Sequence, residues 1–170
     1  MVDGSAGTLF LQDLHLGGKG EVRNEPGVGP LFIENILGNA LTLTNPQEVW
    51  ARQLNLESIV DPKITNNGGK FWVLGLKSEG RSSELTATGG SSTEVLGGFI
   101  SLIGDIPMPN NIPAWGVVDS NISLIYAINS FTAAQFPTQI LETRNGVTYT
   151  VLATSLPSRY AGSFMPLYAN

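Results

Sequence analysis

The sequence contains no cysteine, which excludes disulfide bonds and thiolate metal sites. Charged residues make up 14% of the chain, well below the usual quarter or so of a soluble domain. The 9 lysine and arginine residues form no basic cluster and the net charge is −5, so we expect no nucleic-acid partner. No apolar run approaches the roughly 18 residues of a spanning helix, so we expect no membrane insertion. Low charge with abundant Asn, Thr, Ser and Gly favours an extracellular or cell-surface location.

Signals for α-helix are almost absent too. No window sustains apolar residues at helical spacing behind a capping residue. Short runs of β-forming residues alternate instead with clusters of Gly, Asn, Pro and Ser. The clearest runs are TLFLQDLHL (8–16), PLFIENIL (30–37), EVWARQLNL (48–56), KFWVLGLKSE (70–79), STEVLGGFISLIG (92–104) and NISLIYAIN (121–129). With 170 residues, this pattern predicts one all-β domain.

Several runs match one another when the sequence is shifted by 22 residues. The shift aligns Trp50 with Trp72 and Glu57 with Glu79. After residue 101 the interval to the next matching run is longer than 22 residues, and we expect an inserted loop there at about residues 105–118. A period of this length, built from strands and turns, is typical of a β-solenoid, in which stacked coils close a core that no coil closes alone.

We therefore predict a right-handed, single-stranded parallel β-helix over residues 1–136, with coils of about 22 residues. Asn145-Gly146 stands between two alternating runs, and this dipeptide is a strong signal for a tight antiparallel hairpin. We expect residues 137–170 to form a C-terminal cap that consists of this hairpin and an irregular tail. Such a cap would protect the open strand edges at the end of the stack.

Strand alternation assigns each column of aligned residues to a face. The columns through Leu31 and Ile33 are apolar and are expected to face inward. The column between them is expected to face outward and contains Phe10, Phe32, Trp50, Trp72 and then Glu94. The next outward column contains Gln12, Glu34, Arg52, Leu74 and Leu96, in which Glu34 and Arg52 can pair across adjacent coils.

The outward column of four aromatic residues allows three interpretations. It could bind sugar rings, since exposed apolar stripes usually have a partner. It could be covered by the tail, the inserted loop or a neighbouring subunit, which is the commonest arrangement. It could also be core, if the assignment of faces is reversed. The candidate binding residues are therefore Phe10, Phe32, Trp50, Trp72 and the neighbouring Arg52.

The segments EVWARQLNLE (48–57), NNGGKFWVLGLKSEG (66–80) and STEVLGG (92–98) resemble the C-terminal coils of parallel β-helix proteins in the pectate-lyase-like superfamily. The resemblance covers roughly residues 40–100 and is greatest to large secreted or surface members. It implies a polysaccharide partner and, for the family's enzymes, lyase or glycosidase chemistry. The acidic calcium-binding cluster of the lyases and the paired-Asp, Gly-His-Gly and Arg-Ile-Lys motifs of the hydrolases do not occur in this sequence.

Glycosidase chemistry needs two carboxyl groups about 5–10 Å apart. Glu57 and Glu79 are the best available pair, because they align in adjacent coils, but their turn positions are ones where solvated charges are normal. We treat them as weak catalytic candidates. His15 is the only histidine, and no residue set predicts a metal site or a cofactor.

These features favour a non-catalytic C-terminal β-helix section of a secreted carbohydrate-active or surface protein, which serves stability, association or glycan contact. A polysaccharide lyase or glycoside hydrolase of the same superfamily is the first alternative. A trimeric spike or filament subunit is the second, with partners that would be further copies of the chain or the remainder of a longer one.

Overall fold

The computed structural model describes residues 1–18, 20–103, 108–130, 135–159 and 162–170. Over these residues the chain forms a parallel β-solenoid of about six turns, with about 22 residues in each turn and an antiparallel pair at its C-terminal end. The predicted all-β solenoid is therefore confirmed. No helix of the described part is long and apolar enough to cross a membrane.

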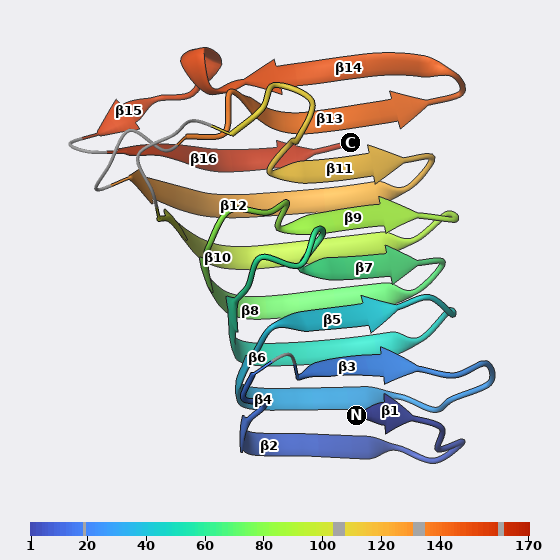
Figure 1. Cartoon of the computed structure of the whole chain (residues 1–170). Helices are drawn as coiled ribbons and strands as arrows, with labels where there is room; N and C mark the ends of the chain where they lie inside the picture. Colours follow the sequence, from blue (N-terminus) through green and yellow to red (C-terminus); the bar gives the residue numbers. More distant parts are fainter. Residues whose placement is uncertain (19, 104–107, 131–134, 160–161) are drawn as a thin grey trace.

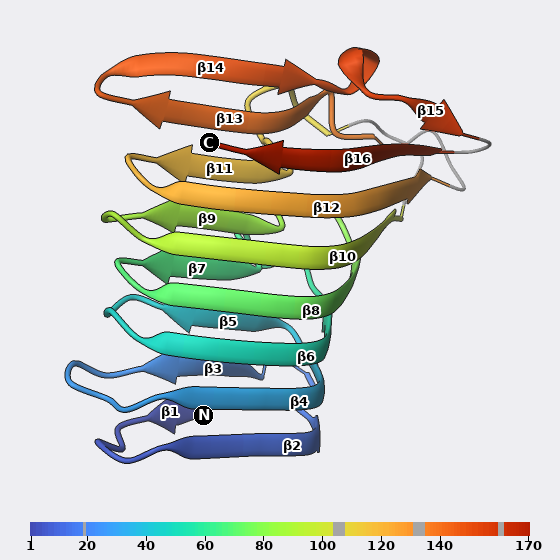
Figure 2. The same ribbon diagram turned by 180° about the vertical axis from the view of Figure 1, so that it is seen from behind.

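Each coil contributes one long strand and one short strand, and each kind stacks into its own sheet (Figures 1 and 2). The C-terminal strands bring each of the two sheets to eight strands. The long strands are β2 (Leu9–His15), β4 (Leu31–Gly38), β6 (Glu48–Glu57), β8 (Lys70–Glu79), β10 (Ser92–Leu102) and β12 (Asn121–Ser130). The short ones are β1 (Val2–Asp3), β3 (Glu21–Asn24), β5 (Ala40–Leu43), β7 (Ile64–Asn67), β9 (Leu85–Thr88), β11 (Trp115–Val118) and β13 (Thr138–Arg144).

The register of the long strands follows the repeat in the sequence. Trp50 of β6 lies beside Trp72 of β8, and Glu57 lies beside Glu79 in the same pair of strands. The interval from Phe32 to Trp50 is only 18 residues, but it keeps the same register, because Phe32 of β4 lies beside Trp50. Because the pairing repeats without a slip from β2 to β10, equivalent side chains form straight columns across these coils.

The core lies between the two sheets and consists of the columns predicted to face inward. Leu31, Val49 and Phe71 form one fully buried column, and Ile33 and Val73 belong to the next. The short strands supply the opposite wall with Leu41, Leu43, Ile64, Leu85, Ala87, Trp115 and Val117. The apolar columns stabilise the stack because each coil covers the apolar surface of the coil below it.

Each of the first five long strands bends at one residue with a positive φ. The bend residues are Asp13, Asn35 and Gln53, each with a φ of 53°, followed by Gly75 at 78° and Gly97 at 81°. A residue in the left-handed region breaks the strand alternation, so two consecutive residues point outward and the inward pattern then resumes, as Ala51 and Leu54 show on the two sides of Arg52 and Gln53. Strand β12 lacks this residue, since Leu96 and Gly98 pair with consecutive residues of β12.

The C-terminal end is closed by antiparallel strands. β13 continues through Asn145 and Gly146, with φ values of 51° and 75°, into β14 (Val147–Leu152), as the Asn-Gly dipeptide predicts. A 3-10 turn, η1 (Ala153–Ser155), and β15 (Ser158–Arg159) lead to β16 (Gly162–Ala169), which pairs antiparallel with β12. The expectation of an irregular tail is wrong for β16. Its Pro166 falls beside an irregularity in the pairing with β12, where a missing N–H is tolerated.

The expected inserted loop at 105–118 is only partly a loop. Residues 104–107 lie outside the described residues. The last four residues of the range form β11, which pairs in parallel with both β9 and β13 and carries the fully buried Trp115. The sequence WGVV is short and begins two residues after Pro113, so it gave little indication of a strand.

Candidate binding groove beside an aromatic ladder

Four aromatic side chains stack on one another along the long-strand sheet. We call Phe10, Phe32, Trp50 and Trp72 the aromatic ladder. Successive ring centroids are 4.9, 4.8 and 5.0 Å apart, and successive ring planes differ by 11–12°. The centroid distances match the roughly 4.8 Å separation of neighbouring strands, so the backbone register itself builds the stack.

The aromatic ladder lies on the outward face of the sheet, as strand alternation predicts. Phe10 is 69% exposed and Phe32 is 36% exposed, while Trp50 and Trp72 are half-buried. The interpretation of these residues as core is therefore wrong. The described tail does not lie over them, because β16 extends the same sheet beyond β12. Cover by a neighbouring subunit stays a prediction.

A groove of about 360 Å³ runs beside the aromatic ladder. One wall is the ladder, and the other is the next outward column. That second column contributes Gln12, Glu34, Arg52, Leu74 and Leu96. All of these residues come from β2, β4, β6, β8 and β10, so the groove crosses five consecutive coils. This combination of an apolar wall and a partly polar wall is typical of a ligand site.

The charged groups in the groove neutralise each other. The Arg52 guanidinium donates a hydrogen bond to a Glu34 carboxylate oxygen, which confirms the predicted pair across adjacent coils. Both side chains are more than a third exposed, so the pair contributes at most about 1 kcal/mol to stability. The pair fixes the position of both side chains along the groove and leaves little net charge there.

An apolar stripe continues past the end of the aromatic ladder. Glu94 follows Trp72 at the ladder position, and the exposed apolar residues move to the neighbouring column. That column continues with Leu74, which is 58% exposed, and then with Leu96 and Ile125. The stripe therefore extends from β2 to β12 on one face of the molecule.

The structure brings Glu57 and Glu79 together, but as partners of a lysine. The Lys77 ammonium lies 2.5 Å from a Glu57 carboxylate oxygen and 2.6 Å from one of Glu79. The hydrogen bond from Lys77 is the main cause that lowers the pKa of Glu57, and Asn55 adds a second hydrogen bond. A glycosidase acid needs a raised pKa instead. This cluster lies beyond the bend of the strands and does not line the groove.

One buried ion pair was not predicted from the sequence. Lys63 and Glu84 have exposed fractions of 0% and 1%, and the Lys63 ammonium lies 2.8 Å from a Glu84 carboxylate oxygen. Burial raises the pKa of Glu84, and the charge of Lys63 and its hydrogen bond oppose that rise. The two residues are 21 positions apart, about one coil, and this spacing of opposite charges was the signal that could have revealed the pair.

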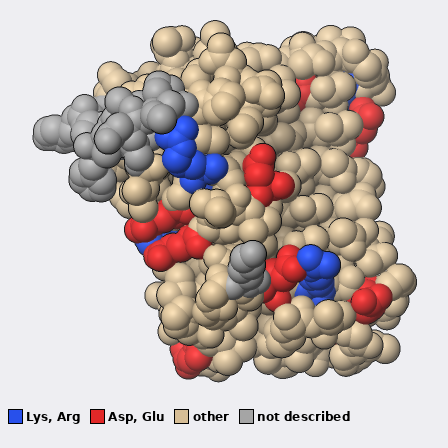
Figure 3. All heavy atoms as spheres, viewed as in Figure 1, with Lys and Arg blue, Asp and Glu red and all other residues tan. Residues whose placement is uncertain are grey.

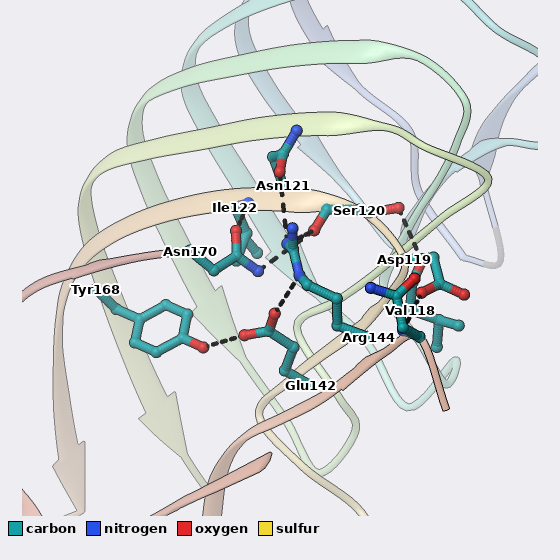
Figure 4. A network of polar contacts seen from close by, with 10 residues as sticks. Val118, Asp119, Ser120, Asn121, Ile122, Glu142, Arg144, Tyr168 and Asn170 are labelled. Carbon is teal, nitrogen blue, oxygen red and sulfur yellow. Dashed lines mark hydrogen bonds and ion pairs between the residues drawn. The ribbon is translucent and has the colours of Figure 1, made fainter. Parts of the chain in front are cut away.

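A second polar cluster holds the C-terminal strand in place (Figure 4). Tyr168 donates a hydrogen bond to Glu142, and Arg144 donates another to Glu142 at 3.0 Å. Arg144 also donates to the carbonyl of Ser120 at 2.7 Å, and Asn170 accepts a hydrogen bond from the backbone of β12 at 2.8 Å. The cluster therefore connects β16, β13 and the turn before β12, which is a structural role.

Within the described residues, no three His, Cys, Asp or Glu side chains lie close enough together to hold a metal ion. We found no family model, curated protein or solved structure that matches this chain.

Proposed function

We propose that this chain is a non-catalytic β-solenoid section of a secreted carbohydrate-active or cell-surface protein, and that it contacts glycan through the groove beside the aromatic ladder. The single observation that supports the proposal is the groove itself. It combines a wall of apolar ring edges, against which the apolar faces of sugars can pack, with the polar side chains of Gln12, Glu34 and Arg52, which can bond hydroxyl groups.

The more specific part of this proposal is that the chain belongs to the pectate-lyase-like superfamily. It rests on the resemblance of residues 40–100 and on the parallel solenoid with coils of about 22 residues. The alternative form of the proposal, a lyase or hydrolase activity, has less support, because Lys77 holds the two best carboxyl candidates, Glu57 and Glu79, in ion pairs. Incubation with a polysaccharide panel tests that form through new reducing ends or unsaturated uronates, and we expect neither product.

Association with further copies is the second candidate function. The observation that favours it is the continuation of the exposed stripe through Leu74, Leu96 and Ile125, where apolar side chains replace the polar wall of the groove. A spike or filament subunit would show an oligomer in light scattering at micromolar concentration. A monomer at these concentrations would contradict it.

The glycan proposal is tested with a glycan array and two variants of the aromatic ladder. Phe10→Ala removes the most exposed ring, and Trp50→Ala removes a ring from the middle of the groove. Tyr149→Ala is the matched control, since Tyr149 of β14 is an exposed aromatic residue outside the groove. We expect both ladder variants to lose binding and the control to retain it. Equal binding by all three variants, or no glycan bound by the unaltered protein, would contradict the proposal.

A further inference from the structure

We propose that the groove takes a neutral, linear glycan that lies parallel to the solenoid axis, with one sugar unit for each coil. This inference rests on the proposed glycan contact and adds the ligand's charge and its direction.

The direction follows from the repeat of the aromatic ladder. The rings succeed one another at 4.8–5.0 Å along the stack of coils, and the groove follows them from β2 to β10. A polymer with a repeating unit close to the roughly 4.8 Å strand spacing meets an equivalent ring at each step. A ligand that runs along the strands instead would meet only one rung of the ladder.

The neutral charge follows from the pairing of the nearby cations. Among the described residues that line the groove, Arg52 is the only cation, and Glu34 binds it. Outside the groove, Lys70 lies 3.0 Å from Glu48, and Lys77 is held by two glutamates. Glu94 adds a carboxylate at the end of the aromatic ladder. A polyuronate would therefore meet no unpaired cation here, and it would approach a chain whose net charge is −5.

The stacking of the ladder sets how affinity grows with ligand length. Phe32 and Trp50 each have a ring neighbour on both sides, so they offer a sugar mainly their edges. The contact of one sugar unit is then weak, and useful affinity requires several units in register. Figure 3 shows the opposite side of the molecule, where the short strands lie in front, and the surface there is mostly uncharged, with acidic and basic groups in small clusters.

Isothermal titration calorimetry tests the length and the charge together. Neutral oligosaccharides of two to six units and oligogalacturonates of the same lengths are titrated into the intact chain. We expect the affinity for the neutral series to increase up to about four units, one for each ring of the ladder. We expect oligogalacturonates of equal length to bind more weakly.

Glu34→Gln provides the sharper test, because it leaves Arg52 without its carboxylate partner. We expect this variant to gain affinity for oligogalacturonate, relative to a neutral oligosaccharide of equal length, by up to about fivefold, the effect of one exposed ion pair. Glu48→Gln is the matched control. It frees Lys70 in the same way, but neither residue lines the groove, so we expect no gain.

The outcomes separate this inference from the proposed function. If oligogalacturonate binds the unaltered chain as tightly as neutral sugars, or Glu34→Gln and Glu48→Gln behave alike, the neutral-ligand inference is wrong and glycan contact stands. If neutral affinity does not change between two and four units, the axial direction is wrong. If no glycan of either series binds, the proposed function itself fails.

Discussion

The four rings of the aromatic ladder differ in how many ring neighbours they have. Phe10 stacks only on Phe32, whereas Trp50 stacks on Phe32 and on Trp72. An aromatic pair contributes about 0.5–1.5 kcal/mol beyond the area that it buries. The middle rings therefore stabilise the solenoid more than the exposed end ring, although all four lie on the outward face.

We expect Trp50→Ala to lower the free energy of unfolding by at least about 1 kcal/mol more than Phe10→Ala does, because it removes one additional stacked pair and a larger ring. Urea denaturation of the two variants measures the difference. A larger loss in Phe10→Ala than in Trp50→Ala would show that stacking does not govern the stability of the ladder.

The buried pair of Lys63 and Glu84 allows a second prediction for single residues. Lys63→Met leaves a buried carboxylate without its partner and should lower the free energy of unfolding by about 3–5 kcal/mol. The double variant Lys63→Met with Glu84→Leu removes both charges and should recover most of that loss. Chemical denaturation of both variants tests this. A double variant as unstable as the single one would contradict the account of the pair as compensated buried charge.

At the scale of elements, the bend in the long strands depends on one left-handed residue in each coil. The bend residues at Asp13, Asn35, Gln53, Gly75 and Gly97 differ in type, but all have a positive φ. Asn and Asp tolerate this region, and Asn35 also donates a hydrogen bond to Asp13 at 2.7 Å. The five bend positions therefore share a backbone conformation but not a residue type.

We expect Gly97→Asn to cost little stability, because asparagine adopts this conformation in the same column and a Cβ at Gly97 would meet nothing within 4 Å. Gly97→Val should cost about 1–2 kcal/mol, since a β-branched residue resists a positive φ of 81°. Thermal unfolding of the two variants measures the contrast. Equal costs would indicate that space and not backbone conformation limits the position.

The cluster that holds β16 should make stability depend on pH. Burial on its own would raise the pKa of Glu142, but the hydrogen bonds from Tyr168 and Arg144 outweigh it and lower the pKa below its ordinary value. A lowered pKa in the folded state gives stability that is present above the unfolded pKa and is lost as the pH falls through the folded one.

We expect the unaltered chain to exceed Glu142→Gln in stability by about 1.5–3 kcal/mol at pH 7, since the charged group accepts two hydrogen bonds. The difference should shrink as the pH falls below the ordinary carboxyl pKa of 4.5. Denaturation curves at pH 7 and pH 3.5 measure it. A difference that grows towards acid pH would contradict the sign of this linkage.

The sequence predicted the long strands and their faces because side chains two residues apart share an environment. The shift of 22 residues located Trp50 beside Trp72, and alternation located both outside. It did not predict the bend, because a column of Asp, Asn, Gln and Gly has no common property except backbone tolerance. It also did not predict β11 or β16, since their pairing partners are distant in the chain, β11 begins two residues after Pro113 and β16 contains Pro166.

At the scale of the whole molecule, the parallel register makes one outward column into a continuous surface. Four rings and the neighbouring polar column form a groove that no single coil contains. The sequence alone indicated these residues, but it could not show that the described tail extends the sheet beyond β12 and leaves them uncovered, because that depends on long-range pairing. The charge balance of the groove likewise depends on which glutamate each cation meets.

Quenching of tryptophan fluorescence by acrylamide tests the central claim most directly. Trp115 is fully buried and therefore shielded from acrylamide. The quenching of the unaltered chain therefore measures how accessible Trp50 and Trp72 are in the groove. Trp50→Phe with Trp72→Phe keeps a ring at each ladder position, leaves only Trp115 as a reporter and is the control. We predict that a saturating neutral linear oligosaccharide lowers the quenching of the unaltered chain and leaves that of the control unchanged. Unaltered quenching in the presence of a neutral glycan that calorimetry shows to be bound would contradict the claim that the groove is the binding site.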